Sequence, residues 1–273
     1  MWEAISDELG DETALIHGAS NRSWSEFDHR AAQFAALLEA HGIGRDAKVA
    51  FYLYNGPEYV EATFGCFKAR AVPVNVNYRY TESELGYLLD NSDAKAVVFS
   101  AELAGRLDAV RAGLPRLRLL VGVDGDGGLA GAVDYVQALD VAPAPRIARS
   151  LDDLWFLYTG GTTGMPKGVM WPHRSLLGAA APTFRGAREP APESPAEFAA
   201  TAARIRERDR AIRLLPAAPL MHGTSAIASW GVLQSGGSLV TLESRSLDAD
   251  ALLTAAIPSL SRRQTGAPKG QQS

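Results

Sequence analysis

This sequence has almost no cysteine and no surplus of positive charge. Cys66 is the single cysteine among 273 residues, so no disulfide can form within the chain. A lone thiol with no histidine near it in the sequence is more typical of a buried apolar residue in a reducing compartment than of a catalytic nucleophile. The formal net charge of −4 leaves no basic surplus to neutralise a phosphate backbone, which argues against nucleic acid as a partner.

Long hydrophobic runs are also missing. No apolar stretch reaches the roughly 18 residues that a membrane-spanning helix needs. The N-terminus is acidic and lacks the basic start and apolar core of a signal peptide. Because 47% of the residues are apolar and 21% are charged, the chain has the balance of a globular protein with a buried core. We therefore expect a cytoplasmic protein without a transmembrane segment.

Short apolar runs alternate with helical patterns along the chain. VAFYL at residues 49–53 is typical of a buried strand, and apolar residues recur at helical spacing in the segments between such runs. We expect Ser25 to cap the helix that follows it, with Asp28 three residues on, and Thr81 and Glu84 to form a capping box. The alternation predicts an α/β fold with largely parallel sheets flanked by helices.

The pattern changes at two places. Residues 142–146 contain two prolines, and we expect a subdomain boundary near residues 145–152. From residue 257 the periodicity stops, so residues 257–273 are predicted to form a disordered or frameshifted tail. Residues 1–256 would then form one domain that is incomplete at its C-terminus. Such a domain leaves a sheet edge exposed, which favours self-association.

A glycine-rich segment follows the strand predicted at residues 153–158. It reads YTGGTTGMPKGV at residues 158–169. Its glycines leave N–H groups free to converge on an anion, its threonines add hydroxyl donors, and Lys167 adds a mobile positive charge. It is not a Walker A loop, because Lys167 stands between Pro166 and Gly168 instead of before Ser or Thr. The residues predicted to hold nucleotide phosphates are Thr159, Gly160, Gly161, Thr162, Thr163, Gly164 and Lys167.

Four stretches together resemble the adenylate-forming (AMP-binding) superfamily of acyl-CoA synthetases, firefly luciferase and peptide-synthetase adenylation domains. The glycine-rich segment is similar to the family's phosphate-binding signature. FKARAVPVN at residues 67–75, NYRYT at 77–81 and PLMHGT at 219–224 are similar to three further family segments, and the resemblance extends over residues 1–256. It fits the fatty-acyl-CoA and sterol-acyl-CoA synthetase branch best. The last segment implies a substrate pocket with His222, Gly223 and Thr224, in which the histidine gates an acyl tunnel.

The resemblance implies a two-step reaction. A carboxylate attacks the α-phosphate of ATP to give an acyl-adenylate and pyrophosphate, and the thiol of coenzyme A then displaces AMP. The substrate would be a fatty or sterol-derived carboxylic acid, with ATP, Mg²⁺ and coenzyme A taking part. The glycine-rich segment would stabilise the departing pyrophosphate electrostatically, together with Mg²⁺.

Three parts that the resemblance implies have no match in the sequence. They are a Tyr-Gly-x-Thr-Glu stretch whose glutamate helps to hold Mg²⁺, an aspartate in a Thr-Gly-Asp context for the ribose, and a C-terminal lysine that serves adenylation. No catalytic residue and no spacing of metal ligands is therefore identified.

Three hypotheses stay open. The chain is a truncated acyl-CoA ligase with little or no activity, a non-catalytic nucleotide-binding or interaction protein, or an adenylation module that loads a carrier protein. On the first hypothesis, we expect no measurable pyrophosphate exchange with fatty or sterol acids from this chain alone.

Overall fold

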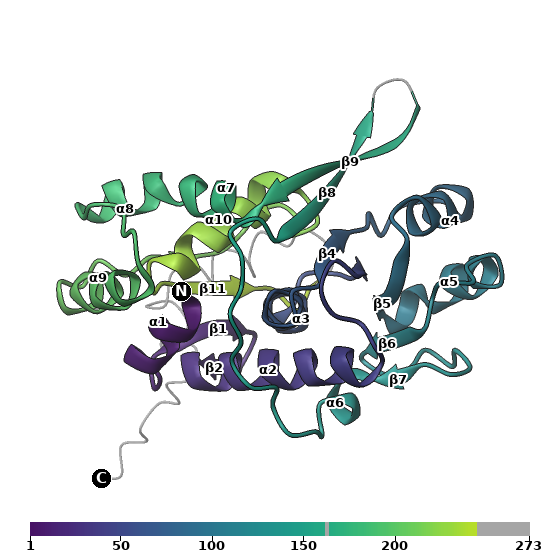
Figure 1. The fold of residues 1–273 in the computed structure, drawn as a ribbon, viewed down its shortest axis with the longest axis horizontal. Helices are drawn as coiled ribbons and strands as arrows, with labels where there is room; N and C mark the ends of the chain where they lie inside the picture. Colours follow the sequence, from purple (N-terminus) through teal and green to yellow (C-terminus); the bar gives the residue numbers. More distant parts are fainter. Residues whose placement is uncertain (162–163, 245–273) are drawn as a thin grey trace, which may run out of the picture.

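A computed structural model describes residues 1–161 and 164–244 of the chain. Thr162, Thr163 and the tail predicted at residues 257–273 lie outside the described residues. The described part contains two β-sheets with helices between and around them (Figure 1). The predicted α/β fold with largely parallel sheets is confirmed.

The larger sheet has seven strands in the order β7-β6-β5-β3-β4-β8-β9. Its neighbouring strands run parallel, except for the antiparallel pair β8 and β9. In chain order the strands are β3 Lys48–Tyr52, β4 Val72–Asn75, β5 Ala94–Ser100, β6 Leu119–Val123, β7 Val133–Asp134, β8 Leu154–Gly161 and β9 Gly164–Pro172.

The smaller sheet has the order β10-β11-β1-β2, and only β1 and β2 are antiparallel in it. Its strands are β1 Thr13–His17, β2 Ser20–Ser23, β10 Arg213–Leu214 and β11 Ser238–Thr241. The last described strand, β11, lies between β10 and β1, so among the described strands β10 is the edge on that side. Self-association through such an edge stays a prediction.

The helices cover the sheets and connect their parallel strands. They are α1 Trp2–Glu8, α2 Trp24–Ala40, α3 Pro57–Lys68, α4 Glu82–Asn91, η1 Ala101–Leu103, α5 Ala104–Arg111, α6 Tyr135–Ala138, α7 His173–Ala179, α8 Ala181–Ala187, α9 Pro195–Glu207 and α10 Gly223–Gln234. Figure 1 shows α3 at the centre, between the two sheets, and α4 and α5 on the outer side of the larger sheet. In the described part of the chain, no helix is both long and apolar enough to cross a membrane.

The alternation of side chains along β3 shows how the larger sheet is buried on both faces. Val49 and Phe51 belong to the core that includes residues of α2 and α3. Ala50 and Tyr52 belong to the core formed with α4 and α5. Because consecutive strand residues point to opposite faces, a strand covered on both sides must be apolar at every position, as VAFYL is.

At one of two helix starts the local sequence predicts the N-cap residue correctly, and at the other it does not. The capping box predicted from Thr81 and Glu84 is confirmed at the start of α4. The cap predicted at Ser25 is wrong, because Ser23 caps α2 in a capping box with Glu26. The hydroxyl of Ser25 instead donates to the carbonyl oxygen of Gly10 at 2.9 Å, a tertiary contact that local sequence does not reveal.

The segment around the predicted subdomain boundary is held against the N-terminal helix by ion pairs. Arg149 contacts Glu3 and Arg146 contacts Asp7, each through two hydrogen bonds. Burial alone would raise the pKa of Glu3, but hydrogen bonds from Arg149 and Lys68 outweigh it and lower the pKa to about 2. The boundary near residues 145–152 stays a prediction, although the segment is firmly attached on this side.

The first testable prediction concerns His173, the first residue of α7. Burial lowers the pKa of its imidazole from 6.5 to about 4, although the carboxylate of Asp153 opposes this shift. The folded state therefore binds fewer protons than the unfolded state between these values. The neutral imidazole's contribution to the free energy of unfolding is fully present above pH 6.5. Up to about 3 kcal/mol of this free energy is lost as the pH falls to 4.

Urea unfolding at several pH values measures this loss. The variant His173→Phe keeps a ring against Phe67, whose centroid lies 4.5 Å from that of the imidazole. It should lose less free energy of unfolding between pH 6.5 and 4 than the unmodified chain. The exposed His29 provides the control, since His29→Phe should leave the pH dependence as it is. Equal pH dependence in the chain and in His173→Phe would contradict the prediction.

Candidate active site

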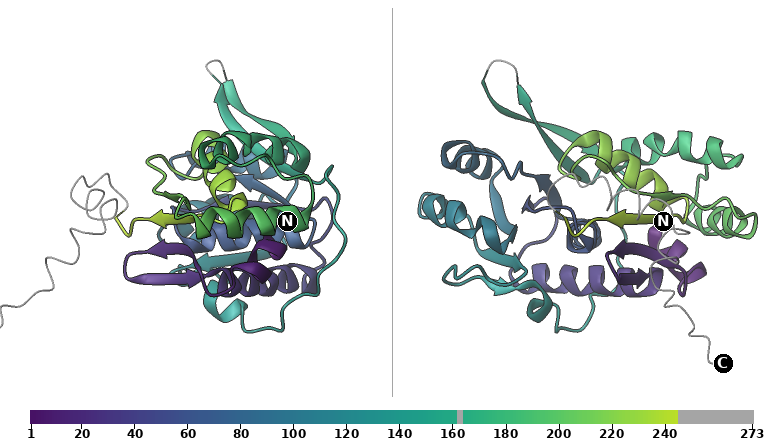
Figure 2. Two further views of the ribbon diagram at one scale, coloured as in Figure 1. Left: turned by 90° about the vertical axis from the view of Figure 1, so that its left-hand side faces the viewer. Right: turned by 180° about the vertical axis from the view of Figure 1, so that it is seen from behind.

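The segment predicted as a phosphate-binding loop forms a β-hairpin. Strands β8 and β9 pair up to Gly161 and Gly164, and Figures 1 and 2 show the hairpin extending away from the body of the protein. The strand predicted at residues 153–158 therefore continues to Gly161, and most of the glycine-rich segment belongs to paired strands. Neither Gly160 nor Gly168 adopts a positive φ, so these glycines do not form a turn and instead allow the two strands to pair.

Those predicted phosphate ligands that the structure describes lie along this hairpin. Thr159 and Lys167 are exposed and directly opposite each other in the register. Opposed residues of an antiparallel pair project on the same face, so the hydroxyl and the ammonium group can act on one anion. Gly160 is exposed beside them. Whether these residues bind phosphate stays a prediction.

The root of the hairpin is packed tightly around Tyr158. A Cβ atom added to Gly168 would lie 2.8 Å from the Tyr158 ring, closer than any real side chain allows. The Tyr158 hydroxyl donates to Oδ1 of Asn91 in α4 at 2.8 Å, which fixes the ring. Gly168 is therefore required for packing, whereas nothing lies within 4 Å of a Cβ at Gly160.

The segment resembling a substrate-pocket motif leads into α10. His222 is the N-cap residue of that helix, and both it and Thr224 are exposed. A Cβ at Gly223 would lie 2.6 Å from a methyl group of Leu157, so a larger residue at the point where α10 meets β8 would require the Leu157 side chain to move. The structure thus places these three residues beside the hairpin root. Their role in a substrate pocket stays a prediction.

Two asparagines hold this loop in place. The Oδ1 atom of Asn55 accepts a hydrogen bond from the backbone N–H of Leu220 at 2.7 Å. The buried amide of Asn75 donates to the carbonyl oxygens of Tyr158 at 3.0 Å and Met221 at 2.5 Å. Its Oδ1 accepts from the N–H of Tyr158 at 2.5 Å. One side chain therefore connects the hairpin root to the loop before His222.

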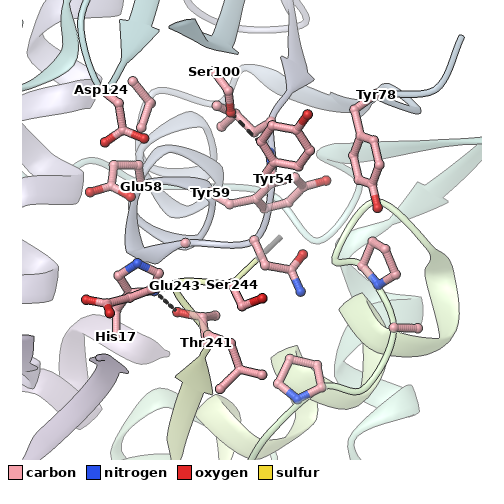
Figure 3. Close-up of a pocket in the computed structure, with 18 of the residues that line it drawn as sticks. His17, Tyr54, Glu58, Tyr59, Tyr78, Ser100, Asp124, Thr241, Glu243 and Ser244 are labelled. Carbon is pink, nitrogen blue, oxygen red and sulfur yellow. Dashed lines mark hydrogen bonds between the residues drawn. The ribbon is translucent and has the colours of Figure 1, made fainter. Parts of the chain in front are cut away.

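A cleft of about 420 Å³ opens at the carboxyl ends of the parallel strands, where ligands of α/β proteins bind (Figure 3). Its walls come from residues that end or follow β1, β3, β5, β6, β10 and β11. The rings of Tyr54 and Tyr78 lie 4.8 Å apart in it, and His17 Nδ1 is 2.8 Å from Thr241 Oγ1.

Among the described residues, none of those predicted to bind phosphate or to form the substrate pocket lines the cleft. Pro219, the first residue of the PLMHGT segment, lines the cleft, but no described residue of β8 or β9 does. The loop at residues 219–224 therefore reaches the cleft through Pro219 and the hairpin root through Met221, whereas Lys167 lies outside the cleft.

Several residues around this site were not singled out from the sequence. Tyr54 and Asn55 directly follow a predicted strand, so the rule that ligands gather at the carboxyl ends of parallel strands could have drawn attention to them. Asn75 was part of a family-like stretch, but its partners lie 83 and 146 residues further along the chain. No local pattern signals a contact over that distance.

The second prediction compares two glycines of the hairpin. Gly168→Ala should lower the free energy of unfolding by about 1–3 kcal/mol, because the new methyl group displaces the Tyr158 ring. Gly160→Ala, in open space, should change it by less than about 0.5 kcal/mol. Urea unfolding of both variants and the unmodified chain gives the two differences. Equal effects of the two substitutions would show that Tyr158 is not packed as described.

Comparisons with known proteins identify the family model and the relatives that this chain resembles. The family model of the AMP-binding enzyme matches residues 2–261. The medium-chain acyl-CoA ligase Mig of Mycobacterium avium is 35% identical over 249 residues, which are 85% of this chain and 44% of that protein. The medium/long-chain-fatty-acid–CoA/3-oxocholest-4-en-26-oate–CoA ligase of Mycolicibacterium smegmatis is 35% identical over 246 residues, 88% of this chain and 44% of its own length.

A solved structure shares the fold. The N-terminal domain of FACL13 from Mycobacterium tuberculosis superposes with a TM-score of 0.76 at 22% identity, covering 94% of this chain and 59% of that one. This chain spans less than half the length of the two curated relatives. Since the family model matches nearly the whole chain and both relatives exceed 30% identity over most of it, the chain belongs to the AMP-binding enzyme family.

Proposed function

We propose that the chain takes part in the ATP-dependent activation of a fatty or sterol-derived carboxylic acid and its transfer to coenzyme A. The observation that carries this proposal is the Asn75 amide, which joins the root of the Lys167 hairpin to the loop before His222. The hairpin would hold ATP phosphates and the loop would border the acyl group. The names of the two curated relatives support the substrate class and the acceptor.

The chain's own residues would act by binding and charge stabilisation. Lys167 carries a positive charge on a projecting hairpin, next to the hydroxyl of Thr159. These groups would hold the β- and γ-phosphates and offset the charge that develops on pyrophosphate as it leaves. His222, at the start of α10, would border the acyl chain.

A resident metal does not fit the described residues. Within residues 1–161 and 164–244, no three His, Cys, Asp or Glu side chains lie together as a metal site. We propose that Mg²⁺ enters as MgATP, since this ion is commonly bound through substrate phosphates. The exposed Lys167 and Thr159 would contact the phosphates and not the ion.

This absence also bears on turnover. The described residues hold no cluster of three His, Cys, Asp or Glu side chains that could bind the metal. We therefore propose that these residues bind nucleotide but give little or no acid-dependent pyrophosphate exchange without further groups. Of the other hypotheses, neither a non-catalytic protein nor a carrier-loading module gains support from a specific contact.

The third prediction tests the phosphate site. ATP should bind the chain weakly with one site, and Lys167→Ala should weaken binding by about 10- to 100-fold, which corresponds to the loss of one hydrogen bond to a charged group. Isothermal titration calorimetry in the presence of Mg²⁺ measures both constants.

Lys95 lies in β5, away from the hairpin, so Lys95→Ala is the matched control and should bind ATP like the unmodified chain. Circular dichroism checks that each variant folds. If the unmodified chain does not bind ATP, or if Lys167→Ala binds it equally well, Lys167 does not belong to a phosphate site.

A further inference from the structure

We infer that Asn75 is a positioning residue that couples phosphate binding at the hairpin to the placement of the loop at residues 219–224. This inference rests on the proposed function, because it assumes that the hairpin binds ATP. It goes further by assigning a task to a residue that contacts neither ligand. That task is to make the acyl-side loop respond when the phosphate side is occupied.

The Asn75 amide is used fully and in one orientation. Its two donor hydrogens go to the carbonyl oxygens of Tyr158 and Met221, and its oxygen accepts from the N–H of Tyr158. The reverse orientation would place the amide oxygen against two carbonyl oxygens, so the partners determine which end of the amide is the oxygen and which is the nitrogen. The side chain is only 5% exposed, and water cannot readily replace a partner that moves away.

The Asn75 side chain bonds to β8 just beyond the point where β4 and β8 stop pairing. Between β4 and β8 the register joins Val74 to Phe156, and beyond that point the side chain of Asn75 holds the backbone of Tyr158. Tyr158 in turn pairs with Gly168 across the hairpin. Any rotation of the hairpin about its root therefore displaces the atoms that Asn75 holds.

The other end of the connection is equally constrained. Met221 is buried, and its neighbour Leu220 is held by Asn55. The carbonyl oxygen of Met221 directly precedes His222, the N-cap of α10. A displacement of Tyr158 must therefore break a buried hydrogen bond or carry the loop with it. Breaking the bond would leave a buried carbonyl group unpaired, which costs about 1–3 kcal/mol.

Hydrogen–deuterium exchange of the full chain, with and without MgATP, tests this fourth prediction. In the unmodified chain, MgATP should slow exchange about fivefold in residues 154–161 and also in residues 217–222. Asn75→Asp has nearly the same shape and keeps the acceptor for Tyr158 but loses both donors. It should bind ATP and protect residues 154–161, yet lose the protection of residues 217–222. A merely structural role would change exchange equally in both ligand states.

Asn91→Asp is the matched control. Asn91 only accepts a hydrogen bond from the Tyr158 hydroxyl, so an aspartate there keeps the contact, and the loop should still respond to ATP. If a buried carboxylate at position 75 prevents folding, Asn75→Ser is the alternative variant. Serine is too short to make the hydrogen bonds of the amide, and it adds no charge. It should likewise abolish the response.

The outcomes separate this inference from the proposed function. Binding of ATP with protection of the hairpin but not of residues 217–222 overturns the inference and leaves the phosphate site intact. Absence of ATP binding contradicts the proposed function. In that case, hydrogen–deuterium exchange of the chain without ATP tests whether Asn75 links Tyr158 to the loop. Asn75→Asp must speed exchange in residues 217–222 about fivefold more than Asn91→Asp does. Equal rates overturn it.

Discussion

The side-chain amide of Asn75 is the interaction on which the arrangement of this site depends. It lies at the carboxyl end of β4, inside the core, and makes three hydrogen bonds to two distant backbone segments. Without it the hairpin root and the loop before α10 would each carry unpaired polar groups in a buried place, which proteins avoid. The site is therefore built around a buried polar contact.

Glycine serves this architecture mainly by its lack of a side chain. Leu157 and Tyr158, adjacent in β8, are approached by Gly223 from the start of α10 and by Gly168 from β9. A Cβ at either glycine would meet the neighbouring side chain at 2.6 and 2.8 Å respectively. Gly168 and Gly223 thus let β9 and the start of α10 lie close to β8, which leaves Thr159 and the other exposed hairpin residues available to a ligand.

The sequence predicted the fold class because hydrophobic periodicity is a local property that strands such as VAFYL display fully. The capping box of Thr81 and Glu84 is equally local and was correct. The cap predicted at Ser25 was wrong because the Ser25 hydroxyl donates to the carbonyl oxygen of Gly10. The pairing of β8 with β9 was not predicted, because glycine content does not reveal that two strands pair. The Asn75 contacts span 83 and 146 residues, so only the folded chain brings them together.

The central claim is that nucleotide phosphates bind at the hairpin and not in the cleft at the carboxyl ends of the parallel strands. The most direct measurement is a crystal structure of the chain with a non-hydrolysable ATP analogue and Mg²⁺. The account predicts a phosphate oxygen within hydrogen-bonding distance of Lys167 Nζ and an intact contact between Asn75 and Met221. A nucleotide held in the cleft beside Tyr54 and Tyr78, with Lys167 in solvent, would contradict it.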